Sequence, residues 1–149
     1  MKNKSNVYKM SIIAVMAAVI CILGPLSIPI GPVPISFTNL AIFISLYTLG
    51  IKKGTMSYII YMFIGFAGVP VFSGFSSGPS KLLGPTGGYL IGFILMALIA
   101  GFFIDKYFDK LYLCFAGMVL GDIACYIVGT AWLAYQANMS LSAALAVGV

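Results

Sequence analysis

The stretch Gly84-Pro85-Thr86-Gly87-Gly88-Tyr89-Leu90 opens a long, charge-free apolar run, and it contains the strongest local signals in the chain. Pro85 suits the first turn of a helix, where its missing N–H costs nothing. The backbone amides that follow it are then unpaired donors at the helix start. In a membrane, such a helix start suits an anionic or hydrogen-bonding small molecule. The spacing of Gly84, Gly88 and Gly92 also has a second explanation, close packing against another helix.

The composition predicts an all-α integral membrane protein. Of the 149 residues, 62% are hydrophobic and only 7% are charged. The mean hydropathy of +1.11 lies far outside the range of soluble domains. A helix needs about 20 residues to cross the hydrocarbon core. Stretches without any charge that can hold such helices are residues 10–51, 54–80, 82–104 and 123–149.

The same composition disfavours several functional classes. The net charge of +5 comes from lysines without arginine, which gives little support to nucleic-acid binding. The three cysteines show no CxxC spacing and the chain has no histidine, so we expect neither a transition-metal site nor a bound cofactor. Without His, Glu or Arg, acid–base and triad chemistry lack their usual residues. We therefore do not expect an enzyme.

We predict one transmembrane domain over residues 1–149. Apolar runs predict helices at about 7–23, 36–51, 54–69, 85–104 and 111–134, and the start of a sixth from 141. The last run gives only about 14 Å of helix against a hydrocarbon core of about 30 Å. We therefore expect the chain to stop inside its sixth helix.

The connections between the helices predict the topology. Short charged turns at 52–54 and 105–110 alternate with long, apolar, Pro/Gly-rich connections at 24–35 and 70–84. A cytoplasmic N-terminus places every lysine except Lys81 on the inner side, as the positive-inside rule requires. This predicts a multi-pass protein of the cell membrane.

The two long connections predict a cavity on the outer side. All seven prolines lie in or at the edge of these connections, and the helix interiors contain none. The flanking helices are short, so the connections must dip into the bilayer. Irregular backbone is tolerated there only where protein buries it or where it lines a cavity.

Two further features carry alternative interpretations. Asp122 lies about 16 Å into the fifth predicted helix, near the membrane midplane. An ionisable group there is either a functional residue or a hydrogen-bonded aspartate packed between helices. Ala14 and Ala18 form a smooth strip on the first helix, suited to close helix contact within the chain or with a partner. Asp105 and Asp109 alternate with lysines, and we interpret them as part of a solvated charge run.

Four segments together resemble the BioY family, the biotin-specific substrate-binding subunits of energy-coupling factor (ECF) transporters. The segments are PVPISFTN at 32–39, GVPVFSG at 68–74, GPTGGYL at 84–90 and CYIVGTAW at 125–132. The resemblance implies a six-helix S-component bundle that holds biotin beneath its extracellular loops. It also implies that Ala14 and Ala18 face the transmembrane coupling subunit. Because the chain lacks a GxxxxGK[ST] loop, ATP hydrolysis would come from partner ATPase subunits.

The predicted site combines the motif residues with the cavity. We expect the amides of Gly87 and Gly88 to face the ligand, Trp132 to form a wall and Lys81 to attract the carboxylate. The full set of predicted biotin-binding residues is Asn39, Lys81, Thr86, Gly87, Gly88, Tyr89, Tyr126, Thr130 and Trp132.

Two departures from the family pattern and two rival functions remain. Residues 75–79 are bulkier and more polar than the glycine-rich stretch of the family, and the family's acidic-and-lysine motif in helix 6 would fall beyond Val149. The rival functions are an S component for a different vitamin, and a small membrane scaffold or enzyme centred on Asp122.

Overall fold

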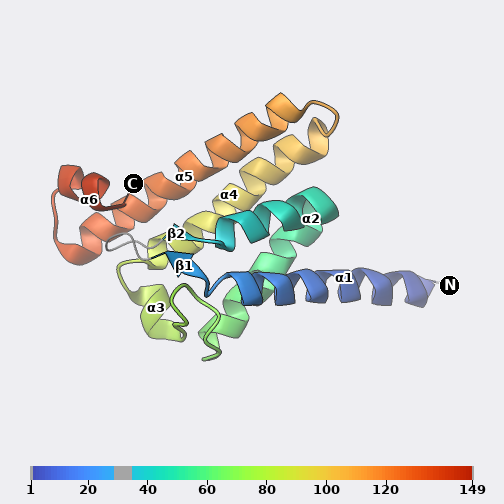
Figure 1. Cartoon of the computed structure of the whole chain (residues 1–149), viewed down its shortest axis with the longest axis horizontal. Helices are drawn as coiled ribbons and strands as arrows, with labels where there is room; N and C mark the ends of the chain where they lie inside the picture. Colours follow the sequence, from blue (N-terminus) through green and yellow to red (C-terminus); the bar gives the residue numbers. More distant parts are fainter. Residues whose placement is uncertain (1, 29–34, 149) are drawn as a thin grey trace.

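The computed structural model describes residues 2–28 and 35–148, and it is almost entirely helical (Figure 1). Two short strands pair as an antiparallel hairpin, with Ser27 opposite Ser36. The predicted all-α class is confirmed. The elements in chain order are α1 (Lys2–Leu23), β1 (Ser27–Ile28), β2 (Ile35–Ser36), α2 (Thr38–Phe66), α3 (Pro79–Leu83), α4 (Gly87–Lys106), α5 (Leu111–Ala137) and α6 (Leu141–Gly148).

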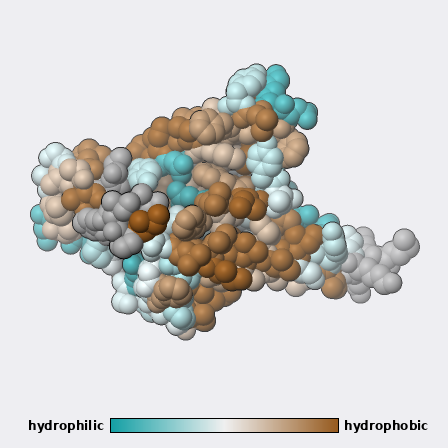
Figure 2. Space-filling view, in the orientation of Figure 1, coloured by the Kyte–Doolittle hydropathy of each residue, from teal (hydrophilic) through white to brown (hydrophobic). Residues whose placement is uncertain are grey.

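Part of the predicted first connection lies outside the described residues. This holds for Pro29, Pro32 and Pro34, and so for the first part of the 32–39 segment. Within the described part of the chain, three helical stretches are long and apolar enough to cross a membrane: Ser5–Leu23, Gly87–Lys106 and Leu111–Ala137. Figure 2 shows wide apolar surface over the helices, as expected for surfaces that face lipid.

The helix α2 is two helices joined at a sharp reversal. Gly50 has φ +77° and ψ 175°, and the two arms run in opposite directions in Figure 1. From the sequence we predicted this break at residues 52–54, but these residues are helical in the structure. The reversal falls on Gly50 because a positive φ carries no penalty for glycine. The Asp105 carboxylate then accepts the Ile51 N–H at 3.1 and 3.3 Å, which caps the second arm.

The bundle has two different ends (Figure 1). The turn end holds the N-terminal part of α1, the reversal at Gly50 and the turn at 107–110. The loop end holds residues 24–28, 35–37, 67–86 and 138–140. Short turns therefore gather at one end and the long connections at the other, as the sequence predicted.

Part of the connection between α2 and α4, around Val71 and Phe72, is buried by the protein. Phe72 is fully buried, and its ring packs edge-on against Tyr61 with the centroids 5.6 Å apart. Tyr61 Oη donates to the Val71 carbonyl at 3.0 Å. The Gly74 N–H donates to the Pro25 carbonyl at 3.1 Å and so joins the two long connections. These contacts bury the irregular backbone around Val71 and Phe72, the arrangement that a bilayer interior would require.

This connection also contains α3, a short helix that the sequence did not predict. Pro79 begins α3 directly after Gly78, whose φ is +87°. Proline suits a first helical turn and glycine suits the positive φ before it. Lys81 lies in the last turn of α3, close to the start of α4. The predicted Pro/Gly-rich loop therefore presents its single cation from a helical turn.

Candidate binding site at the loop end

Three of the predicted site residues meet where α4 begins. Tyr89 is buried, and its Oη lies 3.3 Å from Thr130 Oγ1 on α5. The Tyr89 ring packs edge-on against Tyr126 with the centroids 6.1 Å apart. Thr130 is buried, whereas Tyr126 keeps 39% of its surface exposed. These residues form a polar and aromatic cluster between α4 and α5.

The glycines of the 84–90 segment allow α4 to lie tightly against α5. A Cβ atom on Gly88 would overlap the Trp132 side chain. A Cβ atom on Gly92 would lie 3.0 Å from both the Cys125 carbonyl oxygen and its Sγ atom. Gly129 on α5 meets the Tyr89 ring in the same way. The close-packing explanation for the glycine spacing therefore holds at Gly88 and Gly92.

The turn before α4 is held by its own hydrogen bonds. The Gly84 carbonyl accepts the Gly87 N–H and Trp132 Nε1–H, both at 3.0 Å. The Gly87 amide therefore already has a protein partner. Thr86 is the N-cap residue of α4 but makes no side-chain capping hydrogen bond there. Ligand contacts at Thr86, Gly87 and Gly88 stay predictions.

Trp132 anchors the segment that links α3 to α4. The Trp132 indole N–H donates to the Gly84 carbonyl. One turn later on the same face of α5, Gln136 Nε2 donates to the Leu83 carbonyl at 2.8 Å. The sequence predicted Trp132 as a wall of the ligand cavity. The structure adds an anchoring role for its indole N–H.

Asn39 and Asp122 form a polar pair where the first arm of α2 begins. Asn39 Nδ2 donates to Asp122 Oδ1 at 3.3 Å. Asn39 is the second residue of α2, while Asp122 lies about 16 Å along α5. The first arm of α2 therefore begins near the middle of α5. The alternative of a hydrogen-bonded Asp122 between helices is thus observed.

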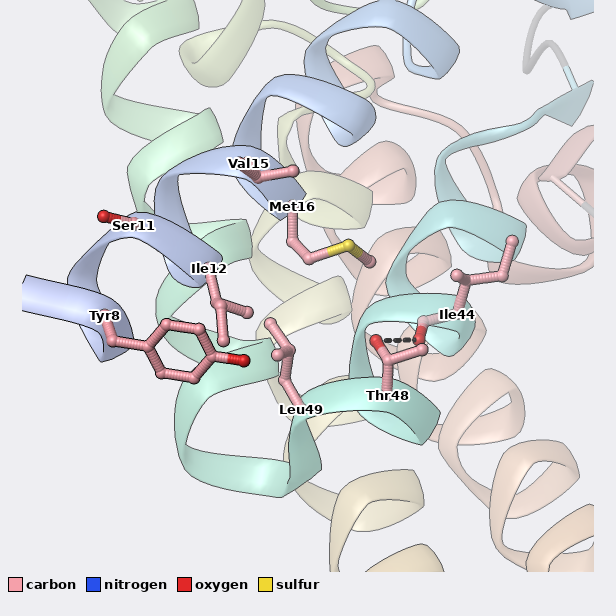
Figure 3. Close-up of a pocket in the computed structure, with 8 residues that line it drawn as sticks. All are labelled: Tyr8, Ser11, Ile12, Val15, Met16, Ile44, Thr48 and Leu49. Carbon is pink, nitrogen blue, oxygen red and sulfur yellow. Dashed lines mark hydrogen bonds between the residues drawn. The ribbon is translucent and has the colours of Figure 1, made fainter. Parts of the chain in front are cut away.

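The strip of Ala14 and Ala18 on α1 is exposed. Ala17 and Ile20, farther around the same helix, are buried. A cleft of about 290 Å³ lies between α1 and the first arm of α2 (Figure 3). Its lining residues are Tyr8, Ser11, Ile12, Val15, Met16, Ile44, Thr48 and Leu49. It is apolar and lies toward the turn end, away from the Tyr89 cluster.

Sequence reasoning missed the role of Asp105. It was interpreted as part of a solvated charge run, but it caps the second arm of α2. A negative charge beside an exposed helix start is the physical signal, but no local pattern indicates that this helix start lies beside α4. Within the described ranges, no three His, Cys, Asp or Glu side chains come together as a metal site would require.

The fold and the site define a class of protein. It is a small helical membrane protein whose described connections gather at one end of the bundle, above a polar cluster between two tightly packed helices. The model of the BioY family matches residues 1–149, and the chain belongs to the BioY family.

Two curated relatives and one solved structure support this assignment. The chain is 33% identical over 146 residues to "Biotin transporter BioY2" of Lactococcus lactis subsp. cremoris (strain MG1363), covering 98% of this chain and 80% of that protein. It is 44% identical over 92 residues to "Biotin transporter BioY" of Thermotoga maritima, and the match covers 62% of this chain and 54% of that protein. It also matches the crystal structure of an S-component for biotin from an ECF-type ABC transporter. That match has a TM-score of 0.83 and 35% identity over 98% of this chain and 82% of the other.

Proposed function

We propose that this protein captures biotin as the substrate-specific S component of an ECF-type ABC transporter. The observation that carries the proposal is the match, in both sequence and fold, to an S-component for biotin over 98% of the chain. The proposed role is transport without catalysis.

The chemistry of the loop end suits biotin. Biotin combines an apolar thioether bicycle, a polar ureido group and a carboxylate. The Tyr89, Tyr126 and Thr130 cluster offers aromatic surface beside hydroxyl groups. Lys81 and the N-terminal end of α4 provide positive potential for the carboxylate.

The lysine distribution supports an orientation in the cell membrane. Lys9, Lys52, Lys53, Lys106 and Lys110 lie on elements at the turn end, whereas Lys81 lies at the loop end. The positive-inside rule then places the turn end and the N-terminus in the cytoplasm. Biotin would enter from the extracellular side, where the loop end lies.

Energy for uptake would come from partners. The exposed Ala14 and Ala18 strip suits close contact with a helix of the transmembrane coupling subunit. ATPase subunits would bind that coupling subunit and supply the ATP hydrolysis. The partner subunits complete the transporter in this proposal.

Binding of radiolabelled biotin to the purified protein in lipid nanodiscs tests the proposal. We expect saturable binding that excess unlabelled biotin displaces, and that riboflavin or thiamine leaves unchanged. Displacement by another vitamin but not by biotin would overturn the substrate assignment. Binding of none of the three would favour a scaffold role instead.

A further inference from the structure

The cleft between α1 and the first arm of α2 lies outside the site of the proposed function. Its volume is about 290 Å³, roughly ten times the share of one water molecule in the liquid. On α1 it extends from Tyr8 to Met16, about 12 Å of helix. Figure 3 shows Tyr8, Ile12 and Met16 pointing from α1 towards the first arm of α2. The cleft is therefore an elongated space between two helices.

The lining of the cleft is apolar even where its residues carry hydroxyl groups. Thr48 Oγ1 donates to the Ile44 carbonyl at 2.8 Å. Ser11 Oγ donates to the Val7 carbonyl at 2.9 Å. Both hydroxyls are thus paired within their own helices. A polar occupant would lose its hydrogen bonds to water and gain few in return, whereas a hydrocarbon chain loses none. The lining therefore favours a hydrocarbon occupant.

The cleft is open on the side that faces the membrane. Of its lining residues, Val15 keeps 61% of its surface exposed and Ile44 keeps 41%. The stretch Ser5–Leu23 of α1, which supplies one wall, is long and apolar enough to cross a membrane. The surroundings of such a stretch are the hydrocarbon core of the bilayer. The hydrocarbon available to the cleft is therefore the acyl chain of a membrane lipid.

The turn end of the cleft carries positive charge. Lys9 follows Tyr8 on α1, and Lys52 follows Leu49 after the reversal of α2. Both lysine side chains are exposed. Basic positions between membrane helices, near the membrane surface, bind the head groups of anionic lipids. The turn end of the cleft therefore favours a negatively charged head group.

The acidic residues do not balance this charge. Neither α1 nor α2 contains an aspartate or a glutamate. Asp105 reaches α2 from α4, and its carboxylate accepts the Ile51 N–H. Lys53, which is half-buried, adds a third positive charge to Lys9 and Lys52. The lysines that flank the cleft thus outnumber the carboxylate beside them.

We propose that the cleft holds an acyl chain of an anionic phospholipid, whose phosphate lies beside Lys9 and Lys52. The two parts of such a lipid match the two parts of the site, because hydrocarbon meets the apolar lining and negative charge meets the lysines. A helix of a partner protein would fill the apolar part without requiring the positive end. The Ala14 and Ala18 strip does not line the cleft, so the lipid leaves that strip open. This site goes beyond biotin capture and does not depend on it.

Photolabelling with lipid probes tests the proposal. The full chain is reconstituted in phosphatidylcholine nanodiscs that contain a trace of phosphatidylglycerol or phosphatidylcholine with a diazirine in one acyl chain. Mass spectrometry of the peptides then locates the label. We expect residues 8–16 and 44–49 to be labelled at least about fivefold more by the phosphatidylglycerol probe, the factor that one lysine near an anionic head group supplies. The exposed face of α5 should show no such preference.

Variants of the lysines test the head-group contact. Replacing both Lys9 and Lys52 by glutamine should abolish the preference for phosphatidylglycerol in the cleft. Replacing both Lys106 and Lys110 by glutamine is the matched control, because it removes the same charge from the same end of the bundle. This control should keep the preference.

A variant that fills the cleft tests the acyl-chain contact. Met16→Trp should abolish most of the labelling of residues 8–16 and 44–49 by both probes, because the larger side chain occupies the space of the chain. Leu120→Trp, on the exposed face of α5, is the control and should leave that labelling unchanged. Should Met16→Trp fail to fold, the lysine variants still decide, because Lys9 and Lys52 are exposed.

Several results would overturn the lipid site. Equal labelling of the cleft by both probes would do so, as would a preference that survives the loss of Lys9 and Lys52. Labelling spread evenly over the exposed faces of all helices would reduce the cleft to ordinary lipid contact. Weaker assembly of Met16→Trp with the coupling subunit, together with unchanged labelling, would assign the cleft to that subunit. A protein that fails to bind biotin but shows the expected labelling would overturn only the proposed function.

Discussion

The carboxylate of Asp105 at the end of α4 accepts the backbone N–H of Ile51 at 3.1 Å, directly after α2 reverses at Gly50. An exposed helix start thereby gains a capping group from a different helix. Caps of this kind contribute about 0.5–2 kcal/mol. The turn end is therefore held by a tertiary contact in addition to the local turn.

We expect Asp105→Ala to lower the free energy of unfolding by about 1 kcal/mol, because the Ile51 N–H loses its acceptor. Thermal unfolding in detergent, followed by circular dichroism, measures the loss. Asp109→Ala in the neighbouring exposed turn is the control and should have an effect within about 0.5 kcal/mol. Equal losses in the two variants would mean that the contact contributes nothing beyond general charge.

A methyl group at Gly88 should separate α4 from α5. A Cβ atom there overlaps Trp132, so Gly88→Ala should destabilise the protein by about 1–3 kcal/mol through overpacking. Ile91→Ala, on the exposed side of the same helix, is the control and should change stability less. A Gly88→Ala protein of normal stability that has lost biotin binding would instead identify position 88 as a ligand contact.

Lys81 should act on the biotin carboxylate. If it contacts that group, Lys81→Ala weakens binding of biotin but barely changes binding of the carboxamide of biotin. If it only steers the ligand, the association rate falls and the effect disappears at high salt. Stopped-flow binding at two salt concentrations distinguishes these cases. Unchanged affinity together with an unchanged association rate would remove Lys81 from the site.

The Ala14 and Ala18 strip should matter for assembly and not for ligand binding. Ala14→Leu or Ala18→Leu adds a branched side chain to an exposed helix face and should weaken co-purification with the coupling subunit. Biotin binding by the isolated variants should stay intact. Ala17→Leu, on the buried side of α1, should instead disturb folding. Loss of biotin binding with normal assembly would reassign the strip to internal packing.

The orientation predicts accessibility to a membrane-impermeant thiol reagent. Cysteines introduced at Ser76 and Met139, at the loop end, should react from outside intact cells. Cysteines introduced at Lys53 and Tyr107, at the turn end, should react only after the membrane is opened. The reverse pattern would place the loop end in the cytoplasm and contradict the proposed route of biotin entry.

The sequence alone was sufficient for the class of protein, the rough positions of the helices and the family. Membrane helices follow from apolar runs, which are a local property of composition. The resemblance rested on four short segments, and the family assignment is confirmed. Tyr89 and Thr130 were both expected in one site, and the structure brings their hydroxyl groups to 3.3 Å.

Only the tertiary structure decided how distant residues use their polar groups. The bond from Ile51 to Asp105 crosses 54 residues and lies directly after the helix reversal at Gly50. Asn39 and Asp122 are 83 residues apart, and no local pattern indicates their pairing. The Gly87 amide was expected to be free because its helix start was considered alone, but the Gly84 carbonyl accepts it. Such bonds depend on which helices become neighbours, and that follows from packing of the whole bundle and not from any single segment.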